Sequence, residues 1–402
     1  MQAIYLDNNA TTRLDPVVLD AMMPFLSEHY GNPSSIHGFG EPVRKAIEQA
    51  RTQVAALLGA EHASEIVFTS CATEANSTAI LSAVEALPDR KSIITSVVEH
   101  PAILEVCEHL ERQGYTIHRL AVDGLGRLNL EEYQALLSDD VALVTVMWAN
   151  NETGTLFPIE QMAQMAKARG ILFHTDGVQA VGKLPINLAT SAIDLLSFSG
   201  HKLHGPKGVG ALYVRRGTRF RPLLRGGHQE RGRRAGTENS AGIVGLGMAC
   251  ELAELHMPML QGPIRELRDR LQEGLLARIP CARVTGDPEH RTANTLNIAF
   301  EYVEGEAILL MLNQLGIAAS SGSACTSGSL EPSHVMRAMG IPYTAAHGSI
   351  RFSLSRYTRE REIELVLTQL PLIIERLRSM SPYWQQNKPA VNGIGEFAPA
   401  YG

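Results

Sequence analysis

Two reactive side chains lie where apolar runs with the composition of buried strands come to an end. Lys202 follows the run IDLLSFS (193–199). Asp176 ends the run ILFHTD (171–176), and Gln179 lies three residues later. A carboxylate at the end of a buried strand is costly unless it meets a cation or strong hydrogen-bond donors. The protonated nitrogen of a heterocycle would serve, and a lysine amine can form a Schiff base with a carbonyl ligand.

Imidazole and amide groups follow two further apolar runs. His100 comes after SIITSVV (92–98), and the proline that follows it restricts its backbone. Such a histidine is suited to acid–base chemistry or to stacking on a ring, with a hydrogen-bonded structural histidine as the alternative. Asn150 and Asn151 follow VALVTVMWA (141–149), where they either form a turn or present their amide groups to a ligand.

Small and hydroxylated residues follow the run EIVFTS (65–70) and predict the start of a helix, with Thr73 and Glu74 in its first turn. The free N–H groups of a helix start can bind an anion, and an ordinary N-cap is the alternative. A third metal ligand is missing near His201 and His204, so we expect no metal site.

Predicted strands and helices, which must position these residues, alternate along the chain from about residue 50 to residue 250. Segments with helical spacing, such as 73–87 and 158–170, lie between most of the predicted strands. This alternation predicts a mainly parallel sheet that helices cover on both faces. Ligands of such sheets bind beyond the carboxyl ends of the strands, so an anion site, a histidine, an aspartate and a lysine converge on one edge. Pyridoxal phosphate requires that set of groups.

The pattern changes after about residue 260 and predicts a smaller α+β domain. Helices are predicted over 263–279, 305–316 and 361–377, and strands over NTLNIAF (294–300) and SIRFSLS (349–355). The final residues have no hydrophobic period and predict an extended tail.

Bulk composition disfavours several classes of partner. The chain has 402 residues, 45% of them apolar, which suggests a large core and two or three domains. A net charge of −6 leads us to expect no nucleic-acid partner, and the arginines of segment 226–239 have no interleaved aromatic residues. No apolar run approaches the roughly 18–20 residues that span a bilayer, and no signal-peptide pattern is found. We therefore expect no membrane partner and a cytoplasmic protein.

The cysteines point to one reactive thiol. All five are scattered and none forms a Cys-x-x-Cys pair, which argues against a disulfide framework and a zinc site. Cys325 differs from the others because it lies within AASSGSACTSGSLEPSH (318–334), where nearly every side chain is small. This composition predicts a mobile or tightly turning loop.

Seven short motifs follow one another over nearly the whole chain: FTSCATE, VVEHPA, NNETG, HTDGVQ, SGHKLHGPKG, RAGTEN and SSGSACTSGS. In this order they resemble the pyridoxal-phosphate-dependent cysteine desulfurases of aminotransferase class V, and most closely the nitrogen-fixation type, which supplies sulfur for the iron–sulfur clusters of nitrogenase. The resemblance implies fold type I, an α/β fold with a mainly parallel seven-stranded sheet. It places the large domain at 13–258, the small α+β domain at 1–12 and 259–382, and an extended tail at 383–402.

The resemblance also implies a role for each motif residue. Lys202 would carry pyridoxal phosphate as a Schiff base, and Asp176 would pair with the protonated ring nitrogen. Gln179 would bind the phenolic oxygen of the ring, and His100 would stack on the ring and move protons. The other implied cofactor contacts are Ala72, Thr73, Ser199, His201, Asn151 and, from the neighbouring subunit of a homodimer, Thr237. The implied substrate contacts are Asn151, Arg351 and Asn9.

The implied reaction converts L-cysteine to L-alanine. Lys202 would take the Cα proton, and the Cys325 thiolate would attack the substrate sulfur and keep it as a persulfide. The implied acceptor is an iron–sulfur cluster scaffold protein, so Cys325 would contact a cluster only transiently. Two alternatives stay open. One is another class V enzyme, an aminotransferase or a selenocysteine lyase, and the other is a non-enzymatic sulfur carrier with a mobile cysteine.

Overall fold

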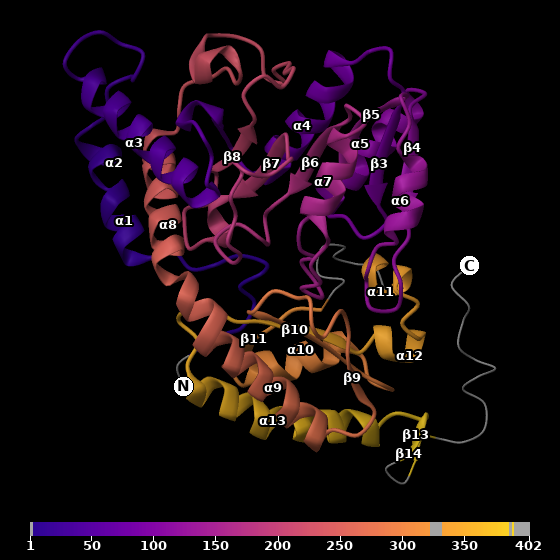
Figure 1. The fold of residues 1–402 in the computed structure, drawn as a ribbon. Coiled ribbons are helices and arrows are strands. Elements are labelled where there is room, and N and C mark those ends of the chain that lie inside the picture. Colours follow the sequence, from indigo (N-terminus) through magenta and orange to yellow (C-terminus); the bar gives the residue numbers. More distant parts are fainter. Residues whose placement is uncertain (1–2, 322–331, 386–387, 390–402) are drawn as a thin grey trace.

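A seven-stranded sheet forms the centre of the computed structural model, which describes residues 3–321, 332–385 and 388–389 (Figure 1). In spatial order its strands are β2 (Ile66–Thr69), β8 (Gly210–Val214), β7 (Leu195–Ser199), β6 (Leu172–Asp176), β5 (Val141–Thr145), β3 (Ser92–Ser96) and β4 (Thr116–Leu120). All run parallel except β8, which is antiparallel to both of its neighbours. The predicted mainly parallel seven-stranded sheet is therefore confirmed.

Helices cover both faces of this sheet, as the sequence predicted. One core includes α3 (Gly40–Leu58), α7 (Ile159–Lys167) and α8 (Ser240–Met259), and another includes α4 (Ala72–Ala86) and α5 (Pro101–Arg112). Successive residues of a strand point to opposite faces of the sheet, so alternate residues pack in the two cores. In β2, Ile66 and Phe68 join the first core and Val67 joins the second. Because both faces are buried, most of these strands lie within nearly continuous apolar runs.

Strand β4 was not predicted, and its position explains why. It lies at the edge of the sheet and pairs only with β3. Only Ile117 and Leu120 of its sequence TIHRL are buried, so no apolar run marks it. The strand predicted over 141–149 was too long. Strand β5 ends at Thr145, and the residues that follow lead into a turn.

A smaller α+β unit has a hydrophobic core of its own. Its antiparallel sheet has the order β12 (Ser349–Ser353), β10 (Thr295–Phe300) and β9 (Ala282–Val284). The helices α9 (Arg265–Arg278), α10 (Gly305–Gln314) and α13 (Glu360–Ser379) pack in the same core. Strand β1 (Ile4–Tyr5) pairs in parallel with β11 (Ile317–Ala318), so the N-terminal segment belongs to this core. The domain limits given above stay a prediction.

The remaining elements are short. They are α1 (Pro16–Met22), α2 (Pro24–Ser27), α6 (Leu130–Leu136), α11 (His334–Ala338), α12 (Tyr343–Ala346), the 3-10 turns η1 (Ala63–Glu65), η2 (Gly200–Lys202) and η3 (Gln229–Gly232), the π-turn η4 (Leu260–Ile264), and β13 (Trp384–Gln385) paired with β14 (Lys388–Pro389). Residues 386–387 and 390–402 of the predicted tail lie outside the described residues.

One helical stretch, Ser240–Arg278, is long and apolar enough to cross a membrane by length and composition alone. The sequence analysis expected no such stretch. In the structure α8 packs closely along α3, because a Cβ at Gly247 would lie 2.6 Å from the Cα of Ala50. Ile243, Leu246 and Cys250 of this helix are buried in the large core. A helix that is buried against its own protein passes the same test, and we assign α8 as a core helix.

A buried ion pair anchors the loop that contains η3. The Nη1 and Nη2 atoms of Arg51 donate to the carboxylate of Glu230 at 2.7 and 2.8 Å, and both side chains are only 3% exposed. The backbone N–H of Phe68 donates to the same carboxylate at 3.0 Å. Glu230 and Arg231 have φ values of 49° and 58°, a left-handed conformation that is strained for residues other than glycine. The ion pair therefore holds this strained turn against β2.

Replacing Glu230 by glutamine should destabilise the protein markedly. Glu230→Gln leaves the buried Arg51 guanidinium with only the half-exposed Glu48 as a carboxylate partner among the described residues, and we expect a loss of about 3–5 kcal/mol in the free energy of unfolding. Urea denaturation followed by circular dichroism measures it. Glu48→Gln is the matched control, because Glu48 also contacts Arg51 but is 49% exposed, and such pairs contribute about 0–1 kcal/mol. Equal stability of the two variants would contradict the assignment.

Candidate active site

A cavity of about 350 Å³ lies at the carboxyl ends of β6 and β7, within the size range of small-molecule sites. All residues assigned from the sequence line it, except two. These lining residues are Asn9, Ala72, Thr73, His100, Asn151, Asp176, Gln179, Ser199, His201, Lys202 and Arg351. Thr237 lies elsewhere, and Cys325 lies outside the described residues. The motif residues thus converge on one edge of the sheet, as the strand-end argument predicted.

Asp176 ends β6 and is 6% exposed. Its Oδ2 accepts a hydrogen bond from Nδ2 of Asn76 at 2.7 Å, and its Oδ1 accepts from the backbone N–H of Val178 at 3.0 Å. The sequence analysis missed Asn76, which is buried on α4 and also lines the cavity. Asn76 lies one helical turn after Thr73, so its spacing from the predicted anion site was the available signal. The two donors fix the carboxylate at the cavity wall.

His100 precedes α5 as its N-cap residue, and its Nδ1 accepts from the backbone N–H of Ala102 at 3.1 Å. Burial lowers the pKa of His100, and Lys202 lowers it further, while Asp176 opposes the shift. A neutral imidazole that accepts at Nδ1 carries its proton on Nε2. His100 can therefore donate a proton from Nε2, and the proline after it sets its backbone as predicted.

The start of α4 forms a polar end of the cavity. Cys71, the N-cap residue, makes no side-chain hydrogen bond to the helix, so Ala72 and Thr73 begin the helix without a side-chain cap. The first N–H groups of a helix have no acceptor within it, which makes this end suited to an anion. Ser199 and His201 line the same cavity. Burial lowers the pKa of His201 to about 4, so this imidazole is neutral at neutral pH.

Lys202 ends η2 immediately after β7. Its Nζ donates to the backbone carbonyls of Asn9 at 2.5 Å and Ala10 at 2.7 Å. The backbone around it is closely packed, because a Cβ at Gly205 would lie 2.8 Å from the carbonyl oxygen of Gly200. Glycine is required at position 205 for this approach of the backbone.

Gln179 and Lys202 donate hydrogen bonds to the same acceptor. Its Nε2 donates to the Asn9 carbonyl at 3.0 Å, the same oxygen that accepts from Lys202. Its Oε1 accepts from Nζ of Lys183 at 2.5 Å. The sequence analysis did not identify Lys183, which is 7% exposed and lies one turn after Gln179. Residues 178–183 form a turn and not a helix, so no spacing rule marked Lys183 in the sequence.

Arg351 comes from β12 of the smaller unit and is 5% exposed. Its Nη1 donates to the Asn151 carbonyl at 3.0 Å, and its Nη2 pairs with Asp7 at 2.9 Å. Its Nε is buried and has no hydrogen-bond partner among the residues described. Asn150 forms the turn itself, because its Oδ1 accepts from the N–H groups of the next residues, whereas Asn151 lines the cavity. Asn150 therefore forms the turn, and a contact of the Asn151 amide with a ligand stays a prediction.

Two buried carboxyl groups near the cavity were also missed. Glu99 accepts from the Ser96 hydroxyl at 2.6 Å and from the Met147 N–H at 3.0 Å, and burial raises its pKa to about 8. Glu152 accepts from the Ser333 hydroxyl at 2.6 Å, and burial raises its pKa to about 7. Desolvation disfavours the charged form of each, so both hold a proton more readily than exposed glutamates.

Thr237 lines a separate hollow of about 90 Å³ together with Ser70 and Arg234. Arg234 pairs with Glu74 of the first turn of α4 at 2.9 Å, so the loop that carries Thr237 is tied to the helix that begins at the cavity. Thr237 does not line the cavity of its own chain.

Comparison with known proteins assigns the family. The aminotransferase class-V family model matches residues 4–366. A cysteine desulfurase of Enterobacter agglomerans is 68% identical, and the cysteine desulfurase NifS of Azotobacter vinelandii is 65% identical, each over the full length of both chains. A solved structure of a NifS-like protein superposes with a TM-score of 0.88 at 39% identity, covering 94% of this chain and all of that one. A structure described as SspA in complex with cysteine has a TM-score of 0.78 at 35% identity, covering 89% of this chain and all of the other. The chain therefore belongs to the cysteine desulfurases of aminotransferase class V, with the PLP-dependent fold type I that the resemblance implied.

Proposed function

We propose that this protein uses pyridoxal phosphate, bound in the 350 Å³ cavity, to transfer sulfur from L-cysteine to Cys325 with release of L-alanine. The observation that carries the proposal is the convergence of Lys202, Asp176, Gln179 and His100 on one cavity. The non-enzymatic alternative would leave this convergence unexplained, since a sulfur carrier needs none of these groups.

The donor set of the cavity fits pyridoxal phosphate. Lys202 is the amine that would hold its carbonyl carbon, and Asp176, fixed by Asn76, would accept from its ring nitrogen. The uncapped start of α4 with Thr73 would bind its phosphate, together with Ser199 and His201. When bound, this cofactor supplies an electron sink for negative charge at the substrate carbon beside the amine.

The substrate carboxylate would bind at Arg351. The buried Nε of this guanidinium has no partner among the described residues, and arginine matches a carboxylate through its planar set of donors. Arg351 would have to share its guanidinium with Asp7, which already accepts from Nη2. Asn151 and Asn9 lie beside it, since Asn9 Nδ2 donates to the Asn151 carbonyl at 3.2 Å.

The remaining chemistry is proton transfer and sulfur transfer. Lys202 takes the proton from the substrate Cα, and His100 exchanges protons at Nε2. The Cys325 thiolate then forms a bond to the substrate sulfur, and the carbon–sulfur bond breaks with its electron pair going to carbon. That carbon takes a proton and Cα regains the proton that Lys202 removed, which leaves L-alanine and a persulfide on Cys325.

Partners and location belong to the same proposal. We infer a homodimer in which Thr237 reaches the partner's phosphate site, since it does not line the cavity of its own chain. Large apolar side chains at Leu26, Tyr30, Ile36 and Phe39 are 62%, 74%, 101% and 63% exposed, as expected of a protein interface. We further infer a cytoplasmic enzyme that passes sulfur to an iron–sulfur scaffold for nitrogenase, on the strength of the 65% identity to NifS.

Replacing Cys325 by alanine should abolish sulfur release without removing the cofactor. Cys325→Ala lacks the acceptor of the substrate sulfur, so we expect at least a hundredfold lower sulfide and alanine production. Mass spectrometry of the wild type after exposure to cysteine should show one added sulfur on Cys325. Cys250→Ala is the control, because Cys250 is buried far from solvent in α8. Retained turnover in Cys325→Ala would overturn the assignment, and an added requirement for a keto acid would favour an aminotransferase.

Subunit hybrids test whether Thr237 serves the partner's site. Thr237→Val should weaken pyridoxal phosphate binding about 10- to 100-fold, the loss of one hydrogen bond to a charged group. In a hybrid of Lys202→Ala and Thr237→Val subunits, one site keeps both Lys202 and the partner's Thr237 and should bind with wild-type affinity. A spectroscopic titration measures this. If neither site of the hybrid binds with wild-type affinity, Thr237 acts within its own chain.

A further inference from the structure

Lys183 lies behind the candidate active site, and the sequence around it determines this position. It ends a turn that follows β6, in which Val181 and Lys183 donate backbone hydrogen bonds to Gly177 and Ala180. Gly182 has a φ of 72°, and a Cβ there would lie 2.6 Å from the Leu203 side chain. This glycine therefore lets the chain pass close to the segment that carries Lys202 and directs Lys183 inward.

The Lys183 ammonium group has amide partners instead of an anion. Its Nζ donates to Oε1 of Gln179 at 2.5 Å and to Oδ1 of Asn9 at 3.1 Å. Among the residues that the structure describes, no carboxylate lies within ion-pair distance of it, although it is only 7% exposed. A buried lysine without a counter-ion is expensive, so a structural role alone would be better served by an apolar or amide side chain.

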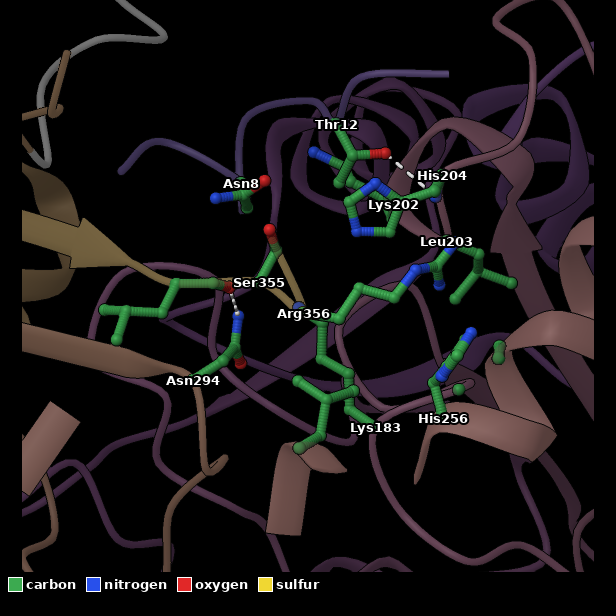
Figure 2. Close-up of a pocket in the computed structure, with 14 residues that line it drawn as sticks. Asn8, Thr12, Lys183, Lys202, Leu203, His204, His256, Asn294, Ser355 and Arg356 are labelled. Atoms are coloured by element: carbon green, nitrogen blue, oxygen red, sulfur yellow. Dashed lines mark hydrogen bonds between the residues drawn. The ribbon is translucent and has the colours of Figure 1, made fainter. Parts of the chain in front are cut away.

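Lys183 and Lys202 also share a second, smaller cavity (Figure 2). This cavity has a volume of about 30 Å³, and both lysines line it. The other titratable groups around Lys183 are His204, His256, Arg356 and Arg351, and Asp15 pairs with Arg356. Burial, then Lys202 and Arg351, lower the pKa of Lys183 to about 7. Its charge therefore changes near neutral pH.

We propose that Lys183 is a positioning residue of the active site, which orients the Gln179 amide and the Asn9 side chain and places a second positive charge behind Lys202. The inference deepens the proposed function, since it concerns the pyridoxal phosphate site. With Lys183 at Oε1, the Gln179 amide must turn its NH₂ group toward the Asn9 carbonyl that accepts from Lys202. The second N–H of this amide would then be the donor for the phenolic oxygen of the cofactor, the role that the resemblance implies for Gln179.

The charge of Lys183 has a defined effect on Lys202. Lys202 is one of the charges that disfavour a proton on Lys183, and because this repulsion is mutual, a charged Lys183 disfavours a proton on the Lys202 nitrogen. Removing the charge should therefore let this nitrogen keep its proton to a higher pH. Lys183 binds the side chain of Asn9 and Lys202 binds its backbone carbonyl, so the two amines are held against the same residue.

The test is a pH titration of the visible absorption band of the protein loaded with pyridoxal phosphate. In Lys183→Met we expect the midpoint of this titration to rise by about one pH unit. Lys183→Gln removes the charge but keeps an N–H donor for Asn9, so it should show the same rise even where Lys183→Met does not fold. Lys183→Arg keeps the charge and should restore the wild-type midpoint. Lys45→Met is the surface control, since Lys45 is 74% exposed.

The outcomes separate this inference from the proposed function. A wild-type protein that binds no pyridoxal phosphate would overturn the proposed function. A wild type that titrates normally, with unchanged midpoints in Lys183→Met and Lys183→Gln, would overturn the role of Lys183 alone. A midpoint in Lys183→Arg that rises as far as in Lys183→Met would also overturn it, because the effect would then follow from packing and not from charge.

Discussion

Every polar group of Asn9 is used to join the two parts of the protein at the active site. Its carbonyl accepts from Lys202 and Gln179, and its Oδ1 accepts from Lys183 and Asn294. Its backbone N–H donates to Ser353, and its Nδ2 donates to the carbonyl of Asn151 and to the Thr295 hydroxyl. The donors Lys202, Gln179 and Lys183 follow strands of the large sheet, whereas residues 294, 295 and 353 belong to the smaller unit. The geometry of the lysine and glutamine therefore depends on how the N-terminal segment docks.

This docking follows from burial of apolar residues elsewhere in the same segment. Ile4 and Leu6 lie in the core of the smaller unit, and β1 pairs with β11. Three residues after Leu6 the chain reaches the cavity at Asn9, and Thr12 accepts the backbone N–H of His204 at 2.8 Å. The position of Lys202 therefore depends, through a segment of ten residues, on the position of the smaller unit. Arg351 of the same unit also lines the cavity.

The surroundings of the cavity are rich in buried titratable groups. Burial raises the pKa of Glu99 and Glu152 and lowers that of His100, His201 and Lys183. Such a concentration of shifted groups is typical of active sites, where desolvation keeps carboxyl and amine groups in states that transfer or donate protons. The buried charges of Arg51 and Glu230 differ from these groups, because each has an oppositely charged partner and the pair holds a loop in place.

Local chemistry along the chain was sufficient to predict the sheet, the helices around it and the strand-end residues Asp176, Gln179 and Lys202. A strand buried on both faces must be apolar, so a polar residue at its end is conspicuous in sequence. The edge strand β4 escaped prediction because its exposed side needs no apolar residues. Glu99 and Lys183 were missed because nothing local distinguishes them from surface residues of a helix or turn, and Asn76 had only its helical spacing from Thr73 as a signal. Their roles depend on which groups lie across the cavity, and long-range packing alone brings Asn76 to Asp176 and Asn9 to Lys183.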